Sequence, residues 1–151
     1  MSVGPTETLI VDASVATTWH LTGEEYTSKA RLILTRYSEG KIPLLIPSHL
    51  RYEVPSAITA ATLGQSPRLS RREGQEAINE FLSLSFQTVA AETLVLSSYS
   101  LVHEHHISLS AALYLALSQT LAVPLVTADR RFYERVRQLP HVVWIGDYPP
   151  S

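Results

Sequence analysis

Short apolar segments alternate with longer segments of helical periodicity along almost the whole chain. The apolar segments predict strands at residues 8–11, 44–46, 85–89, 124–127 and 142–145. The segments between them predict helices at residues 15–20, 26–39, 48–63, 70–82, 91–104, 108–121 and 130–139. Alternation of this kind predicts an α/β domain in which helices cover both faces of a largely parallel sheet.

Single residues mark where two of these helices begin and end. Ser48 is expected to cap the helix that ends before Gly64, because a serine side chain can accept a hydrogen bond from a first-turn amide. Pro55 lies within the first two turns of that helix and predicts a late start or a local distortion. Ser70 is followed three residues later by Glu73, a spacing that predicts a capping box.

The chain has enough apolar material for one well-packed core. Of its 151 residues, 45% are hydrophobic and 17% are charged, so we expect a single domain over residues 1–151 with a core from about residue 8 to residue 148. No apolar run approaches the roughly 20 residues that span a bilayer, and Met1–Glu7 lacks the basic start of a signal peptide. A cytoplasmic location is therefore expected. The absence of cysteine excludes disulfides and thiolate metal sites.

The overall charge argues against a broad nucleic-acid-binding surface, because the formal net charge is −2. Basic residues nevertheless gather in two places, within residues 68–72 and again within residues 130–137. Solvated helix faces explain such clusters when they stand alone. The second cluster directly follows Asp129, which belongs to a candidate acidic site.

Three acidic residues stand where a parallel sheet would gather them. Asp12 follows the first expected strand, Glu53 lies in the helix after the second strand, and Asp129 follows the fourth. Ligands of open α/β sheets bind beyond the carboxyl ends of the strands. Each acid alone is explained at least as well by helix capping or by the helix dipole. Three carboxylates in one crevice repel one another, however, and such an arrangement usually needs a cation.

The segments that carry these acids resemble the motifs of the PIN-domain family, and most closely those of the VapC-like toxins of toxin–antitoxin pairs. Residues 11–15 are similar to the first motif, residues 52–58 to the second and residues 127–132 to the fourth. Residues 142–147 suit the ending of a VapC-like chain. The resemblance covers nearly the whole sequence, from about Leu9 to Tyr148, and rests on the order and spacing of the motifs.

The resemblance implies a three-layer α/β/α sandwich with a five-stranded, mainly parallel sheet in the order 3-2-1-4-5. It also implies a metal-dependent endoribonuclease that uses Mg²⁺ or Mn²⁺. Asp12, Glu53 and Asp129 would be the catalytic and metal-binding acids, and the Ser14 and Thr127 hydroxyls would support them. Bound metal would activate a water and offset charge at the scissile phosphodiester.

The resemblance implies partners as well. Arg130 and Arg131 would contact phosphates of an RNA substrate. VapC-like proteins usually form homodimers and bind a small VapB-like antitoxin in a groove near the active site. The apolar faces of residues 26–37 and 58–63 could form that groove, although packing in the core explains them equally well.

One usual acid of the family is missing. The third motif normally reads Asp, Ala, an apolar residue and Tyr, whereas here the same register, residues 111–114, begins with Ala111. Ser110 is one position away, about 100° around a helix, and is expected to point elsewhere. Two functions therefore remain open: a ribonuclease with weakened metal affinity, and a degenerate PIN domain that binds RNA or protein without cutting.

Overall fold

The computed structural model of the protein describes residues 7–21, 23 and 25–149. Five strands form one sheet: β1 (Leu9–Val11), β2 (Leu44–Pro47), β3 (Gln87–Val89), β4 (Leu125–Thr127) and β5 (Val142–Trp144). Their spatial order is β3-β2-β1-β4-β5, and every neighbouring pair is parallel. The predicted order 3-2-1-4-5 is confirmed, and the sheet is entirely parallel. Residues 1–6, where the sequence predicts no signal peptide, lie outside the described residues.

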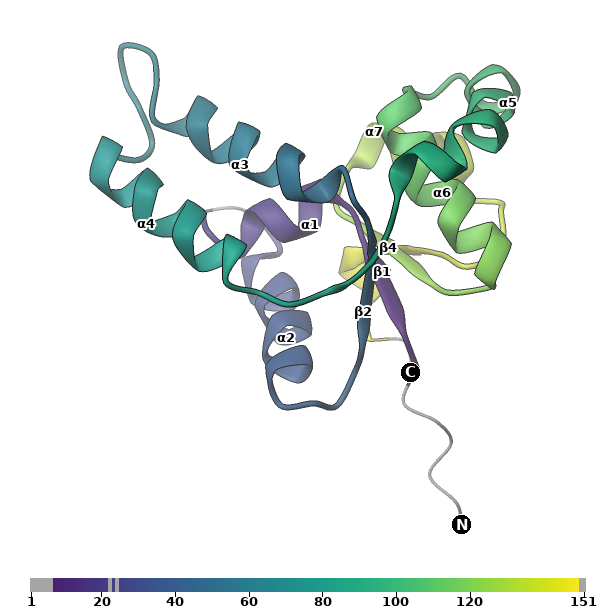
Figure 1. Cartoon of the computed structure of the whole chain (residues 1–151), viewed down its shortest axis with the longest axis horizontal. Coiled ribbons are helices and arrows are strands. Elements are labelled where there is room, and N and C mark those ends of the chain that lie inside the picture. Colours follow the sequence, from purple (N-terminus) through teal and green to yellow (C-terminus); the bar gives the residue numbers. More distant parts are fainter. Residues whose placement is uncertain (1–6, 22, 24, 150–151) are drawn as a thin grey trace.

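Helices connect the strands: α1 (Ala13–Thr18), α2 (Thr27–Ser38), α3 (Leu50–Ala61), α4 (Arg71–Leu82), α5 (Val95–His105), α6 (Leu109–Leu121) and α7 (Arg130–Val136). Two short 3-10 helices, η1 (Ala91–Leu94) and η2 (Ile145–Asp147), complete the described elements. Figure 1 shows α1 to α4 on one side of the sheet and α5 to α7 on the other, which confirms the three-layer arrangement. Paired with each other, α3 and α4 project beyond the sheet.

The core lies between the sheet and the helices that cover its two faces. All residues of β1 and β4 are buried, as expected for central strands covered on both faces. On one side, residues 112–118 of α6 are all buried beneath α5. On the other side, Ala30, Ile33 and Ile58 are buried as well. Core packing therefore accounts for Ala30 and Ile33 of α2 and for Ile58, whereas Leu63 is 65% exposed.

Local signals explain most helix boundaries, with one exception. The Ser70 hydroxyl accepts from the Glu73 amide while the Glu73 carboxylate accepts from the Ser70 amide, so the predicted capping box is confirmed. The predicted Ser48 cap is wrong, because α3 begins at Leu50 and the Ser48 hydroxyl accepts from the Ala91 amide instead. Serine favours local hydrogen bonds of either kind, and here the bond ties β2 to η1. The helix begins at Leu50 and continues through Pro55, which lies inside it as the sixth residue.

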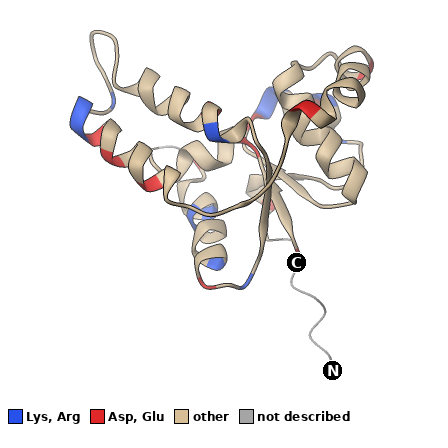
Figure 2. Cartoon of the chain, viewed as in Figure 1, with Lys and Arg blue, Asp and Glu red and all other residues tan. Residues whose placement is uncertain are grey.

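Charged side chains lie on the helices and loops, whereas the five described strands carry none (Figure 2). A sheet covered on both faces leaves no solvated position for a charge, so the acids of any site must follow the strands rather than lie within them. Among the described helices, none has the length and apolar character needed to cross a bilayer.

Candidate active site

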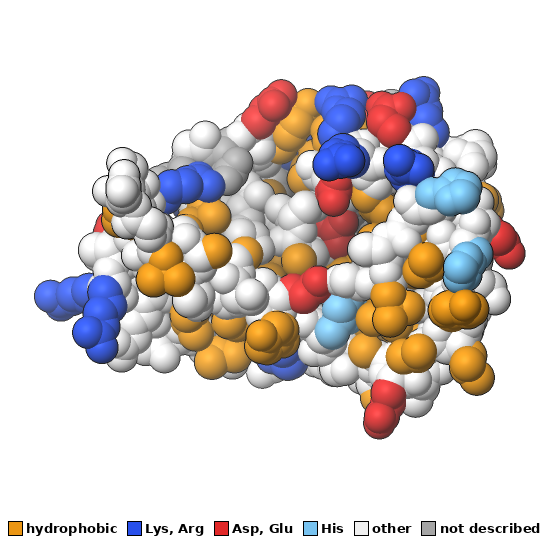
Figure 3. All heavy atoms as spheres, turned by 90° about the horizontal axis from the view of Figure 1, so that it is seen from above, with side chains coloured by type: hydrophobic (Ala, Val, Ile, Leu, Met, Phe, Trp, Pro, Cys, Tyr) orange, Lys and Arg blue, Asp and Glu red, His pale blue; other side chains and the backbone are white. Residues whose placement is uncertain are grey.

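The candidate site lies where β1 and β4 end side by side. Val11 pairs with Val126, and the Asp12 amide donates to the Val126 carbonyl at 3.4 Å, so the residues that follow both strands emerge at the same edge of the sheet. A cavity of about 240 Å³ opens there, and Asp12, Glu53 and Asp129 all line it. The face at which the strands end is hollowed, with acidic side chains inside the hollow and basic side chains along one rim (Figure 3).

Asp12 is a buried carboxylate held by short hydrogen bonds. It is only 7% exposed. The Ser14 hydroxyl donates to Oδ1 and the Thr127 hydroxyl donates to Oδ2, both at 2.5 Å, while the Val15 amide donates to Oδ1 at 3.3 Å. Burial raises the pKa of Asp12 from 3.8 to about 6, because the hydrogen bonds offset only part of the desolvation and Asp129 adds repulsion. The site therefore favours a positive charge close to Asp12.

The two hydroxyls also join the ends of β1 and β4. The Ala128 amide donates to the Ser14 hydroxyl at 2.9 Å, and the Asp129 amide donates to the Thr127 hydroxyl at 3.1 Å. Oδ1 of Asp129 accepts from the Phe132 amide at 3.1 Å and caps α7, whereas the Asp129 side chain as a whole is exposed. Both aspartates thus act as helix caps, as the sequence allows for each acid alone. Capping does not account for their convergence on one cavity.

Glu53 lies in the first turn of α3 and is held from the opposite wall of the cavity. The Tyr114 hydroxyl donates to Oε1 at 2.6 Å and the Ser110 hydroxyl donates to Oε2. Nε2 of His49 lies 3.3 Å from Oε1. The expectation that Ser110 points elsewhere is wrong. Ser110 and Ala111 both line the cavity, because the cavity wall extends over more than one position of α6.

Position 111 belongs to this cavity. Ala111 lines it together with the three acids. The Ala111 amide donates to the Ser108 hydroxyl at 3.1 Å, the N-cap contact that fixes the first turn of α6. A carboxylate in place of the Ala111 methyl group would therefore enter a space already lined by carboxylates.

The oxygen atoms that line the cavity are of the kind that a hydrated magnesium or manganese ion prefers. The side chains that carry them are too few to surround the ion completely. Hard divalent cations prefer oxygen ligands, and Mg²⁺ needs only one or two carboxylates when waters and a substrate phosphate complete its shell. No group of three or more acidic or histidine side chains within the described part of the chain is arranged to hold a metal. Both Asp12 oxygens and both Glu53 oxygens accept from hydroxyls, so each carboxylate still offers lone pairs to such an ion, and Asp129 is the most exposed of the three acids.

The two arginines proposed for substrate phosphates face different cavities. The Arg130 guanidinium lies over the Trp144 ring, 4.3 Å from its centroid, and lines a cavity of about 510 Å³ with Ser14 and Tyr26. Arg131 instead lines a cavity of about 350 Å³ that also contains Ala111 and Asp129. Neighbours in sequence diverge here because successive helix positions differ by about 100°.

Sequence reasoning missed three residues of the site. Tyr114 is buried, and its hydroxyl donates to Glu53. The register of the third family motif places a tyrosine there and was the available signal. Ser110 and His49 carry no comparable signal, because their contacts depend on how α3 and α6 meet.

Comparison with known families decides the classification. The family model described as "PIN domain" matches residues 9–138, which is most of the chain and includes all three acids. The chain belongs to the PIN-domain family. No curated protein matches this PIN domain in sequence.

Solved structures share the fold of this PIN domain. A toxin–antitoxin complex from Klebsiella pneumoniae is 18% identical with a TM-score of 0.61, covering 89% of this chain and 95% of that one. The sarcin–ricin loop cleaving toxin VapC20 of Mycobacterium tuberculosis is 14% identical with a TM-score of 0.61, covering 83% and 93%. A protein from Pyrobaculum aerophilum is 19% identical with a TM-score of 0.63, covering 93% and 92%. The neighbours therefore include VapC-type toxin–antitoxin proteins.

Proposed function

We propose that the protein is a VapC-like endoribonuclease that depends on Mg²⁺ or Mn²⁺, and that Ala111 weakens its hold on the metal. The observation that supports this proposal is the convergence of Asp12, Glu53 and Asp129, from three separate segments, on one cavity that position 111 also lines. Membership of the PIN family and toxin neighbours with the same fold support the same assignment.

The residues have distinct roles in this proposal. Asp12 and Asp129 would bind the cation, which when present supplies an activated water and offsets charge on the scissile phosphodiester. The hydroxyls of Ser14 and Thr127 hold the Asp12 carboxylate in one orientation, so that both its oxygens face defined partners. Glu53, held by Tyr114, would orient a water at the cavity wall.

RNA cleavage in the presence of Mn²⁺ tests the proposal. The purified protein should cut a labelled structured RNA slowly with Mn²⁺, and should not cut it with EDTA. Asp12→Asn is the matched control, because asparagine retains the size and N-cap of Asp12 while losing the charge. Cleavage that persists in the Asp12→Asn variant would come from a contaminating nuclease and would contradict the assignment.

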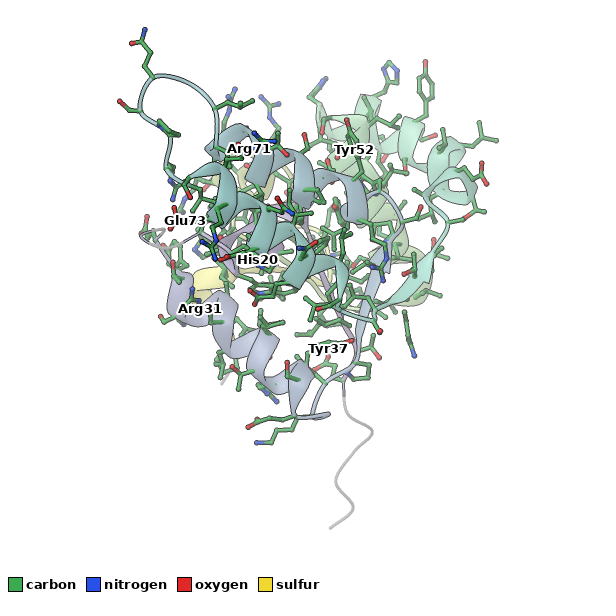
Figure 4. The ribbon with its side chains drawn as sticks, turned by 60° about the vertical axis from the view of Figure 1, so that its left-hand side comes forward. His20, Arg31, Tyr37, Tyr52, Arg71 and Glu73 are labelled. Carbon is green, nitrogen blue, oxygen red and sulfur yellow. The ribbon has the colours of Figure 1, made fainter. Side chains whose placement is uncertain are left out.

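An antitoxin is the proposed protein partner, as for the neighbour that is a toxin–antitoxin complex. A cavity of about 540 Å³ between α2 and α4 offers a place for it, with apolar Leu34, Leu69 and Ala77 in its walls. Figure 4 shows His20 between these helices, with Arg31 on α2 and Glu73 on α4 nearby. Both His20 ring nitrogens are buried without a hydrogen-bond partner among the described residues.

We also propose that the protein forms a homodimer, as VapC-like toxins usually do. Light scattering across micromolar concentrations, with no antitoxin present, tests this proposal directly. A monomer at every concentration would contradict it, and would leave the ribonuclease assignment untouched.

A second candidate function is a PIN domain that binds without cutting. Two observations favour it: position 111 lacks its acid, and both Glu53 oxygens accept hydrogen bonds from protein hydroxyls. RNA binding measured separately from cleavage distinguishes the two functions. Tight binding with no cleavage at any Mn²⁺ concentration would identify the binding module.

A further inference from the structure

A basic cavity adjoins the acidic one, and Ala111 stands at their common wall. The basic cavity has a volume of about 350 Å³, and Arg131, Arg135 and His106 contribute its cationic or ionisable groups. It shares Ser108, Ala111, Asp129 and Phe132 with the acidic cavity. An extended anionic chain could therefore pass from one cavity to the other without leaving the surface.

The two arginines of this cavity have no acidic partner in the described part of the chain. Arg131 and Arg135 are exposed and stand four residues apart on α7, where like charges repel each other. Neither forms an ion pair or hydrogen bond with another described residue. By contrast, Arg130 and Arg137 both have an acidic partner, because a guanidinium nitrogen of each lies near the Glu134 carboxylate, at 4.0 and 3.4 Å. The uncompensated charge is thus confined to the side of α7 that faces the basic cavity.

The first turn of α6 forms the opposite wall of the basic cavity. Ser108 caps this 13-residue helix, and Ala111 is its third residue. An aspartate at position 111 would place a negative charge opposite Arg131 and Arg135. Alanine leaves that wall uncharged, so the field in the basic cavity comes from two arginines, the positive end of the helix and one opposing carboxylate, Asp129.

We propose that this cavity binds a phosphodiester group of RNA next to the one at the acidic site, and that Ala111 makes this binding independent of metal. The inference rests on the proposed ribonuclease function for the identity of the ligand. Arg131 and Arg135 hold one phosphate, and the RNA chain continues past the shared wall toward the acidic cavity, where a bound cation is needed before a phosphate can lie over Asp12 and Asp129. With alanine at position 111, the protein thus has a lower affinity for a cation and a higher affinity for the RNA backbone.

RNA is favoured over an acidic peptide because the basic cavity shares a wall with the acidic cavity, which is the proposed site of RNA cleavage. The net charge of −2 also confines the attraction for polyanions to this local patch.

Binding of a short fluorescein-labelled single-stranded RNA in EDTA, followed by anisotropy over a series of salt concentrations, tests the proposal. Arg131→Gln with Arg135→Gln should weaken binding at least about tenfold at low salt and lower the slope of log affinity against log salt by roughly 0.7, since the two arginines hold one phosphate and each neutralised phosphate of a single strand contributes about 0.7. Arg137→Gln, at the C-cap of α7, is the matched control and should change affinity less than about twofold.

Position 111 gives an independent arm of the same experiment. In EDTA, Ala111→Asp should weaken RNA binding several-fold, whereas Ala111→Asn, of the same size but uncharged, should leave it within about twofold. Added Mn²⁺ should restore RNA binding to the Ala111→Asp variant.

The outcomes are distinct. Unchanged binding in the double arginine variant, or an equal loss in Arg137→Gln, overturns the proposal. Competition by polyglutamate that depends on Arg131 and Arg135, with no RNA binding, assigns the cavity to a protein partner and also overturns it. Metal-free RNA binding with the expected arginine dependence, but no cleavage with Mn²⁺, supports this phosphate site and contradicts only the ribonuclease function.

Discussion

The Thr127 hydroxyl donates a 2.5 Å hydrogen bond to Oδ2 of Asp12, across 115 residues of sequence. The contact exists because β1 and β4 are neighbours in the sheet, although two strands, six helices and one 3-10 helix of the described residues separate them along the chain. The Asp12 carboxylate is buried and has no cation beside it among the described residues. Thr127 supplies one of its three hydrogen-bond donors. The site thus depends directly on the pairing of the two strands.

Removing this donor should destabilise the protein in a pH-dependent way. Thr127→Val preserves the shape of the side chain and should lower the free energy of unfolding by about 1–3 kcal/mol, because a buried acceptor loses its partner. The loss should be larger at about pH 8 than at about pH 5, since the carboxylate is charged only at the higher pH. Urea unfolding at both pH values measures this, with Thr88→Val on β3 as the control. An equal loss at both pH values would mean that Thr127 acts through packing alone.

Neutralising Asp12 should stabilise the metal-free protein. The folded-state pKa of Asp12 is raised from 3.8 to about 6, so its contribution to stability is fully present below pH 3.8 and is lost as the pH rises through 6. Asp12→Asn should therefore raise the free energy of unfolding at about pH 7.5 by up to roughly 3 kcal/mol, from about 1.4 kcal/mol per unit of pKa.

Urea unfolding of the Asp12→Asn variant at about pH 7.5 and about pH 4 measures the gain, which should shrink at the lower pH. Saturating Mn²⁺ should narrow the difference between the variant and the unsubstituted protein, because the metal binds only the folded protein that retains Asp12. A variant less stable than the unsubstituted protein at both pH values would show that burial of Asp12 imposes no charge penalty.

Features set by short sequence patterns or by the topology of the sheet could be predicted from the sequence. The strand order follows from the family resemblance, and the boundaries of α4 follow from Ser70 and Glu73, because a capping box acts over four residues. The convergence of Asp12 and Asp129 follows once β1 and β4 are known to be adjacent. These features need only the pattern of the chain and the topology of the sheet.

Contacts between helices could not be predicted in the same way. Ser48 looks like a helix cap in sequence, yet its hydroxyl bonds the distant Ala91 amide. Ser110 was excluded by helix geometry alone, but α3 brings Glu53 close enough to accept from it. In both cases the deciding partner comes from another element, and its position is set by packing that no short window of sequence contains.

The tyrosine of α6 offers a test of the Glu53 wall. Tyr114→Phe removes the hydroxyl that donates to Glu53 at 2.6 Å, and should lower the free energy of unfolding by about 1–2 kcal/mol. The pKa of this tyrosine is raised by burial and by the nearby Glu53 charge, so the hydroxyl remains a donor at all ordinary pH values. Thermal or urea unfolding measures the loss, and Tyr99→Phe on exposed α5 is the control. A loss no greater than that of the control would indicate that Tyr114 contributes only through its ring.

We propose that this PIN domain keeps a ribonuclease site that lacks one metal ligand, and the initial rate of RNA cleavage by Ala111→Asp with Mn²⁺ is the decisive measurement. The new carboxylate faces a cavity that Asp12, Glu53 and Asp129 already line, so it should strengthen binding of the ion. The rate should rise at least about tenfold over the unsubstituted protein, and the gain should vanish in EDTA or when Asp12→Asn is added. A rate that does not increase with Mn²⁺ would contradict the account, because position 111 would then have no part in a metal-dependent site.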